Sequence, residues 1–147
     1  MAQSEALLVG DKLIEFLALA IAGVTGGSVG GGPTRRQLYM RAVDHISRNL
    51  KDPDLDPAAV AAAVGISQRS LYSIFGEEGK RVADFIIGER LDRAHYELGS
   101  TVGADRSVTD VAMGWGFKSS SHFSRRFVAR FGSTPSEVRS RARKARF

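Results

Sequence analysis

A short pattern that occurs twice limits the possible folds more than any other part of the sequence: an alanine that directly follows a valine and is itself followed four residues later by a glycine. The first copy spans residues 61–65 and the second spans residues 112–116, and an apolar helical pattern follows each. Two closely crossing helices need a small side chain at their contact, and the reversal between them needs a residue that accepts positive φ. Ser67 in the first copy, and Ser119 or Ser120 in the second, can cap the next helix. We therefore expect two helix-turn-helix units.

The other helical patterns place these units within one all-α region. Apolar residues at helical spacing between the units predict a long linker helix at about residues 81–99. Thr34 precedes a helix over about residues 35–50, and residues 134–137 form a capping pattern for a short final helix. The sequence has no alternating strand pattern. The expected fold is all-α, and the linker helix joins a first unit at about residues 56–76 to a second at about residues 107–132.

The N-terminal residues differ in composition from the rest of the chain. Residues 5–24 form a strongly apolar helical pattern, and six of residues 23–32 are glycine, which is typical of a flexible linker. The densest apolar stretch is too short to span a bilayer. We place the domain boundary between residues 1–33 and residues 34–147. The apolar helix is expected to dock on the rest of the chain, to pair with a second copy in a homodimer, or to be the remnant of a removed domain.

Positive charge is concentrated at the C-terminal end. The whole chain has a net charge of +5, whereas residues 118–147 hold nine basic residues and one acidic residue. Residues 1–34 hold one basic and three acidic residues. This asymmetry indicates an anionic partner, with nucleic acid ahead of an anionic membrane. For residues 139–146 alone, a solvated basic tail is the alternative.

The sequence carries no pattern that is typical of catalysis or of a bound cofactor. The absence of cysteine excludes disulfides, thiolate catalysis and cysteine-based zinc sites. His45, His95 and His122 are far apart, and none lies in a metal-binding spacing. A nucleophile paired with a base is missing, and so is a phosphate-binding loop between a strand and a helix. We therefore expect no enzymatic activity, no cofactor and no metal.

The second helix of each unit holds the residues expected to contact DNA. In a helix-turn-helix this helix enters the major groove, and its exposed side chains meet the base edges. Arg69 and Arg125 are the leading base readers, because a guanidinium group can donate two hydrogen bonds to guanine. The other outward candidates are Ser70, Tyr72, Ser73, Ser120, Ser121, Ser124 and Arg126.

Several residues of these elements together form a family signature. The first unit contributes Ala61, Gly65, Ser67, Leu71 and Phe75, and the linker helix contributes Arg90-Leu91-x2-Ala94. The second unit carries a longer signature, Val111-Ala112-x3-Gly116-Phe117-x4-His122-Phe123-Ser124-Arg125-x-Phe127-x3-Phe131-Gly132-x-Thr134-Pro135-Ser136-x2-Val138-Arg139. On these residues, the region 35–147 resembles the DNA-binding domain of the AraC/XylS transcription regulators.

The resemblance implies how the chain meets DNA. It implies a sequence-specific, double-stranded DNA-binding regulator that inserts its two second helices into successive major grooves and activates transcription through contacts with RNA polymerase. It also implies a structural ion pair for Arg90, while Trp115, which precedes the turn glycine, is expected in the core. The expected base contacts are Arg69, Tyr72, Ser73, Ser120, Ser121 and Arg125, and the expected phosphate contacts are Ser67, Lys118, Ser119, His122 and Arg126.

The resemblance further implies a sensing domain that binds a small-molecule effector. Because only about thirty residues precede the DNA-binding region, we expect the effector to bind a domain outside this chain. The chain is then a fragment of a longer regulator, with a naturally short protein as the alternative. The expected location is the cytoplasm, at the nucleoid. The alternative function is a dimerisation or adaptor module whose basic C-terminal part binds nucleic acid non-specifically.

Overall fold

The structure is a computed structural model that describes residues 32–101, 103 and 105–147. Within these residues the chain forms seven α-helices and no β-strand, which confirms the all-α prediction. The apolar helix expected over residues 5–24 and most of the glycine-rich linker lie outside the described residues. The helices are α2 (Arg35–Asn49), α3 (Pro57–Val64), α4 (Gln68–Glu77), α5 (Val82–Gly99), α6 (Val108–Gly114), α7 (Ser120–Phe131) and α8 (Pro135–Lys144).

Side-chain caps fix where most of the helices begin. The Ser67 hydroxyl accepts a hydrogen bond from the N–H of Ser70 at the start of α4, and Ser119 accepts one from His122 at the start of α7. Ser119, and not Ser120, is therefore the cap of α7. Capping boxes, in which the third helical residue also reaches back to the cap, open α2, α6 and α8. The observed helix starts agree closely with those predicted from the sequence, because capping is a local interaction.

A glycine with positive φ forms the turn inside each unit. Gly65 has φ 78° and donates its N–H to the Ala61 carbonyl at 2.9 Å, while Gly116 has φ 87°. Residues with a side chain rarely adopt this conformation. At Gly116 space is also lacking, because an added Cβ would lie 2.6 Å from the carbonyl oxygen of Leu50. Both expected turn glycines are confirmed, and Gly116 has a second reason to be glycine.

Two apolar clusters form the core, and α5 contributes to both. The first cluster lies among α2, α3, α4 and the start of α5, and the second lies among the rest of α5, α6, α7 and α8. α5 places Val82 and Ile86 in the first cluster and Leu91, Ala94 and Leu98 in the second. Burying one large apolar side chain stabilises a fold by roughly 1.5–3 kcal/mol. The linker helix is thus a structural part of both units.

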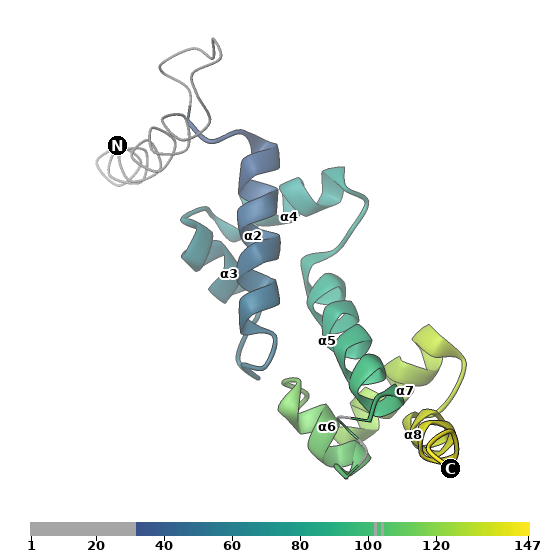
Figure 1. Cartoon of the computed structure of the whole chain (residues 1–147). Coiled ribbons are helices and arrows are strands. Elements are labelled where there is room, and N and C mark those ends of the chain that lie inside the picture. Colours follow the sequence, from purple (N-terminus) through teal and green to yellow (C-terminus); the bar gives the residue numbers. More distant parts are fainter. Residues whose placement is uncertain (1–31, 102, 104) are drawn as a thin grey trace, which may run out of the picture.

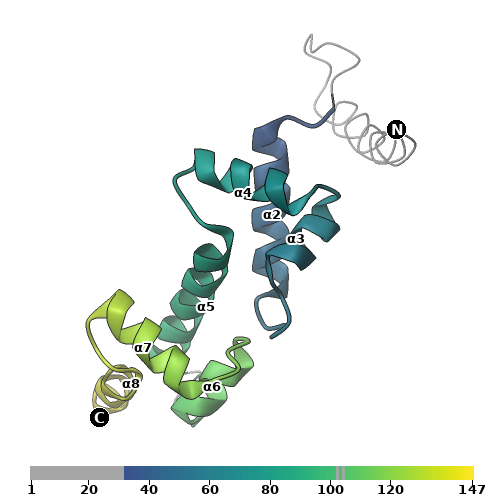
Figure 2. The same cartoon turned by 180° about the vertical axis from the view of Figure 1, so that it is seen from behind.

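α5 joins the two helical units, which lie toward its opposite ends (Figure 1). The first unit contains α2, α3 and α4, and the second contains α6, α7 and α8. Seen from behind in Figure 2, α4 and α7 both lie in front of the helices that support them. These second helices of the two units, the recognition helices, therefore share one side of the molecule. A ligand lying along that side can contact both of them.

Candidate nucleic-acid interface

The outward face of α4 carries three of the residues predicted to contact bases. Phe75 is fully buried, whereas Arg69, Tyr72 and Ser73 are exposed. The Tyr72 side chain is 52% exposed, and its hydroxyl lies 3.4 Å from Gln68 Oε1 on the same helix. The tyrosine is therefore available on the surface and is not packed against the domain.

Ser73 is held by a side chain from another helix. Arg35, the first residue of α2, donates from Nη2 to Ser73 Oγ at 2.7 Å and from Nε to Glu77 Oε1 at 2.6 Å. Because a guanidinium group only donates, Ser73 Oγ accepts this bond and its own O–H is left to donate elsewhere. The sequence pattern did not point to Arg35, since the two residues are 38 positions apart and meet only when α2 packs on α4.

The outward face of α7 carries the other three residues predicted to contact bases, two serines and an arginine. Ser120, Ser121 and Arg125 are exposed, whereas Phe123 and Phe127 are fully buried. The apolar spacing of α7 therefore turns the predicted base-contacting residues outward. The two recognition helices share one side of the molecule, and the six side chains on them that were predicted to contact bases are all exposed.

Three of the predicted phosphate contacts lie at the first turn of a recognition helix. Ser67 and Ser119 are the caps of α4 and α7. His122 is half-buried, and its ring centre lies 6.2 Å from that of Phe117. The N-terminus of a helix favours an anion, because its free N–H groups and the positive end of the helix dipole point outward there. The position of these residues suits a phosphate, although each also has a structural contact.

The two leading base readers are free cations. Arg69 and Arg125 are exposed, and neither has a hydrogen-bond or ion-pair partner among the residues that the structure describes. An unpaired guanidinium group gives up only water when it binds a base or a phosphate. These two arginines are therefore the side chains on the recognition helices that are most ready to bind an external acceptor.

The other two basic side chains of the predicted interface have acidic partners. Lys118 Nζ lies 2.8 Å from Asp54 Oδ1, in the loop after α2, and Arg126 Nη2 lies 3.0 Å from Asp84 Oδ1 of α5. The hydrogen bond from Lys118 lowers the pKa of Asp54 below its ordinary value. All four side chains are well exposed, so water and salt screen these pairs and a phosphate can replace the carboxylate.

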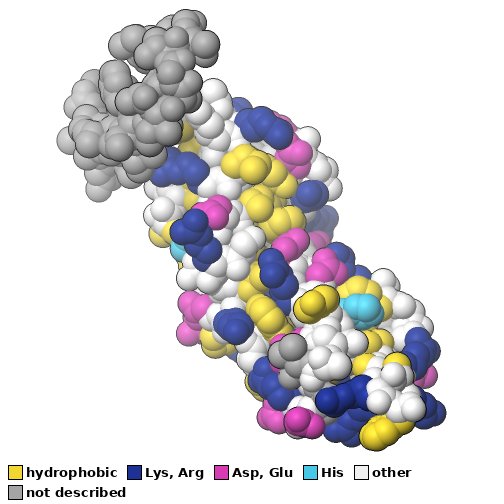
Figure 3. Space-filling view, in the orientation of Figure 1, with side chains coloured by type: hydrophobic (Ala, Val, Ile, Leu, Met, Phe, Trp, Pro, Cys, Tyr) yellow, Lys and Arg dark blue, Asp and Glu magenta, His cyan; other side chains and the backbone are white. Residues whose placement is uncertain are grey.

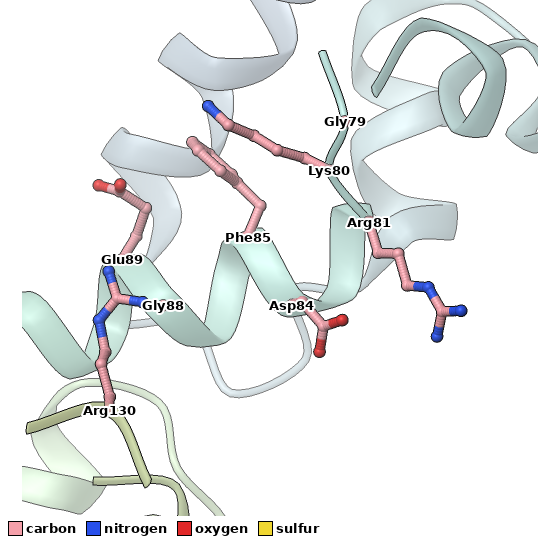
Figure 4. A pocket seen from close by; sticks show the side chains of 8 residues that line it. All are labelled: Gly79, Lys80, Arg81, Asp84, Phe85, Gly88, Glu89 and Arg130. Atoms are coloured by element: carbon pink, nitrogen blue, oxygen red, sulfur yellow. The ribbon is translucent and has the colours of Figure 1, made fainter. Parts of the chain in front are cut away.

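A groove of about 550 Å³ lies between the α4–α5 connection, α5 and the end of α7 (Figure 4). Arg130 enters it from α7 and makes two hydrogen bonds of 2.8 Å to Asp92, which raise the pKa of the guanidinium group. Lys80 extends over the ring of Phe85, 5.3 Å from its centre, whereas Arg81 points away toward solvent (Figure 4). The sequence pattern had not pointed to Lys80 or Arg81, which follow α4 and line this groove together with Arg130 of α7.

The opposite side of the molecule has a mixed surface. On the side shown in Figure 3, basic side chains are interspersed with acidic and hydrophobic ones. In the same orientation in Figure 1, α4 passes behind α2 and part of α7 lies behind α5. The candidate interface is assigned to the side shown in Figure 2, where both recognition helices lie in front of the helices that support them.

Arg90 is buried at the junction of the two units. It is 7% exposed and donates from Nε to the Leu50 carbonyl at 2.9 Å and from Nη2 to the Asp52 carbonyl at 2.6 Å. Burial lowers the pKa of this guanidinium group, and the charge of Asp52 opposes the shift. The structural role expected for Arg90 agrees with this position, but the expected ion pair is wrong. Its hydrogen bonds go to backbone carbonyls, because the loop after α2 presents its backbone to α5.

Trp115 lies where the two apolar clusters meet. It is half-buried and packs against both of them. Its Nε1–H donates to Glu97 Oε2 at 2.6 Å, and Lys51 Nζ lies 4.9 Å from the ring centre. The prediction that Trp115 is structural agrees with this position, and its contacts extend across both units.

The described part of the chain offers little for other kinds of site. Among residues 32–101, 103 and 105–147, no group of three or more histidine, aspartate or glutamate residues is placed to hold a metal ion. No helix in the same residues is long and apolar enough to cross a membrane. The features that remain are the two outward recognition helices and their cationic side chains.

Two helix-turn-helix units that expose their recognition helices on one side are the architecture of a bipartite DNA-binding domain. The family model described as "Helix-turn-helix domain" matches residues 60–141. The chain belongs to the AraC/XylS family of transcription regulators.

Relatives and solved structures agree with this assignment. The chain is 33% identical over 135 residues to the transcriptional activator NphR of a Rhodococcus species, which covers 92% of this chain and 39% of the relative. It is 27% identical to XylDLEGF operon transcriptional activator 2 of Pseudomonas putida, over 89% of this chain and 80% of the relative. An AraC-type regulator structure from Chromobacterium violaceum superposes with a TM-score of 0.65 at 29% identity, covering 73% of this chain and 93% of that chain. The chain spans about two fifths of the length of NphR.

Proposed function

We propose that this chain binds double-stranded DNA in a sequence-specific manner by placing α4 and α7 in successive major grooves, as the DNA-binding part of a transcription regulator. The observation that carries the proposal is that both recognition helices share one side and each presents an arginine without a partner among the described residues. Successive major grooves lie about 34–36 Å apart along B-DNA. A non-specific adaptor requires neither feature, and the family membership also favours the regulator.

Base contacts come from the outward side chains of the recognition helices. A guanidinium group suits guanine, which presents two acceptors in the major groove. Ser73 acts as a donor, because Arg35 already donates to its oxygen, and it therefore suits a base acceptor such as a purine N7. The proposed base contacts are Arg69, Tyr72 and Ser73 of α4 and Ser120, Ser121 and Arg125 of α7.

Phosphate contacts come from residues at the N-termini of the recognition helices and from two basic side chains that exchange a carboxylate partner for a phosphate. Lys118 and Arg126 leave Asp54 and Asp84 to bind phosphate, and the ordered ion pairs keep both cations on the surface until then. These contacts position the protein and carry no sequence information. Ser67, Ser119 and His122 contact phosphates at the first turns of α4 and α7.

The regulatory role extends the proposal to further partners. Because relatives such as NphR are transcriptional activators, we assign activation through RNA polymerase to this protein, in the cytoplasm at the nucleoid. A small-molecule effector binds a sensing domain outside this chain, and residues 5–24 form a homodimer contact. A promoter that carries the selected site ahead of a reporter gene tests the sign of regulation. Expression of the chain then raises transcription if it activates and lowers it if it represses.

Selection of bound sequences from a random DNA library tests the binding proposal. The full chain should enrich two short elements about one helical turn, or roughly 10 base pairs, apart. Arg69→Ala should blur one element and Arg125→Ala the other. Arg48→Ala is the matched control, because Arg48 is exposed and its helical spacing from Ala42 and Ile46 places it away from the buried face of α2. Salt-sensitive binding without enrichment of any sequence would overturn the proposal.

A further inference from the structure

The two units touch each other directly, beside the linker helix that joins them. The loop after α2, residues 50–54, meets the turn between α6 and α7, residues 115–118. Arg90 of α5 lies between the two segments and binds two carbonyl oxygens of the loop. We refer to these segments and Arg90 as the junction.

Close packing at Gly116 holds the second turn against the first unit. A Cβ on this residue would lie 2.6 Å from the Leu50 carbonyl oxygen and 2.9 Å from Arg90 Nε. The backbone of the turn therefore rests on the same carbonyl that accepts the arginine hydrogen bond. Because Arg90 is buried and bonded to two carbonyls, neither the loop nor the turn can move away without exposing or orphaning these polar groups.

Two further contacts cross the junction. Trp115 packs against both apolar clusters, and Lys51 of the first unit lies over its ring. A hydrogen bond to Glu97 of α5 holds the indole in this position. At the edge, Lys118 of the second unit pairs with Asp54 of the first. The units are therefore supported at two places, through α5 and through the junction. A single helix leaves hinges at its ends, whereas two separate supports fix the orientation of one unit relative to the other.

We propose that the junction, through Arg90 and Trp115, sets the half-site spacing that the protein accepts. This inference rests on the proposed function, in which α4 and α7 occupy successive grooves. One base pair added between the two elements moves the second by roughly 3.4 Å and rotates it by roughly 35°. A rigid pair of recognition helices cannot follow this change, so binding at the second element is lost. Arg90 and Trp115 are positioning residues that act without touching DNA.

Two variants loosen the junction without adding bulk to it. Arg90→Met removes the hydrogen bonds to the Leu50 and Asp52 carbonyls but keeps an unbranched chain in the same space. Trp115→Phe keeps an aromatic ring, but it reduces the surface that packs on the first cluster and under Lys51 and removes the hydrogen bond that holds the indole to Glu97. Arg93→Met is the matched control, because Arg93 is exposed on the same helix and has no partner among the described residues. If Arg90→Met fails to fold, Trp115→Phe still tests whether the junction sets the half-site spacing.

The first measurement compares affinities for the selected site and for sites with one base pair inserted or removed between the elements. The unmodified chain and Arg93→Met should lose at least about tenfold on the altered spacings. Arg90→Met and Trp115→Phe should lose clearly less, because a loosened unit can follow the displaced element. The base preference within each element should stay the same, since the recognition helices are intact. A folded variant with an unchanged spacing ratio would overturn the proposal.

The second measurement needs no DNA and separates this inference from the proposed function. Residual dipolar couplings of the unmodified chain should fit one common alignment for both units, whereas those of Arg90→Met should require two. Failure to enrich any DNA sequence would overturn the proposed function, but the couplings would still report on the junction. A single alignment in both folded junction variants would show that α5 alone fixes the units, and the junction would then have no part in spacing.

Discussion

The two helix-turn-helix units share one frame but present different charges. In both units a glycine with positive φ forms the turn and a serine caps the recognition helix. Along its length α4 carries one basic residue, Arg69, whereas α7 carries three, Arg125, Arg126 and Arg130. In the proposed complex the second unit therefore supplies most of the attraction to the phosphate backbone. The first unit contributes mainly through the contacts that distinguish bases.

The linker helix controls how much of this charge is available. Asp84 and Asp92 of α5 pair with Arg126 and Arg130 of α7, so two of the three arginines on α7 have acidic partners. Arg125 has none among the described residues. Partial neutralisation lowers the attraction to random DNA, whereas a free arginine at a base-reading position retains its full charge. In the proposed complex, α5 therefore affects the strength of DNA binding as well as the half-site spacing.

The largest effect on stability is expected from placing a side chain at the turn glycine of the second unit. Gly116→Val should unfold this unit, because the new side chain meets the Leu50 carbonyl and must adopt a φ near 87°. Gly132→Ala is the matched control, since Gly132 also has positive φ but has no atom within 4 Å of an added Cβ. It should cost only about 1–2 kcal/mol. Circular dichroism and urea unfolding measure both variants, and equal losses would show that contact with the first unit does not matter.

A smaller effect is expected from removing the two free arginines one at a time. Arg125→Ala should cost roughly 1–3 kcal/mol on the selected site and relax the preference at about one base pair, with little change on random DNA. Arg69→Ala should do the same at the other element. Fluorescence anisotropy with specific and random duplexes measures both. An equal loss on random DNA would assign the arginine concerned to the phosphate backbone and would weaken the contrast between the units.

Releasing a paired arginine should strengthen binding severalfold. Asp84→Asn frees Arg126 and removes a negative charge near the DNA, so affinity for specific and random duplexes should rise at low salt. The gain should shrink as salt increases, because screening weakens charge interactions. Asp44→Asn is the control, since Asp44 pairs with Arg48 on α2, on the face opposite to the buried residues. An unchanged affinity for Asp84→Asn would mean that the ion pair persists on DNA.

The smallest effect concerns pH and the second unit. Hydrogen bonds with Ser107 lower the pKa of Asp110, and those with Thr134 lower the pKa of Glu137. A carboxyl group with a lowered pKa stabilises the fold at pH above its unfolded pKa, and this contribution is lost as pH falls through its folded pKa. The unfolding free energy should therefore decline in acid, and Asp110→Asn with Glu137→Gln should reduce the decline. Urea unfolding at several pH values measures this decline. If the unfolding free energy of the variant and of the parent fell equally with pH, the assignment of the decline to Asp110 and Glu137 would be contradicted.

Local signals in the sequence were sufficient for most of the fold. Ser67 and Thr134 cap the helices that they were predicted to start, and Gly65 and Gly116 form the predicted turns. Caps and turns depend on residues a few positions apart, and apolar spacing gives the buried face of each helix. The same spacing predicted most of the exposed side chains of α4 and α7, although Ser70 and Ser124, which were also expected to face outward, are half-buried. The contacts of α4 and α7 with DNA stay predictions.

Contacts between segments that are far apart in the sequence could not be predicted from these local signals. Lys118 and Asp54 are 64 residues apart, and Arg126 and Asp84 are 42 residues apart. Periodicity shows that such side chains are exposed but not which other helix passes near them. The same limit explains the wrong expectation for Arg90, because a sequence does not show where a loop turns its carbonyl groups toward a helix.

Trp115 is the only tryptophan of the chain, and it lies against both apolar clusters. Its indole fluorescence is therefore a built-in reporter of both units at once. Because loss of either cluster removes part of the packing that supports the other, the two units should melt together in a single cooperative transition. In the proposed complex, a protein that melts in one transition would bind at both grooves or at neither, and partly folded molecules would not occupy half of a site.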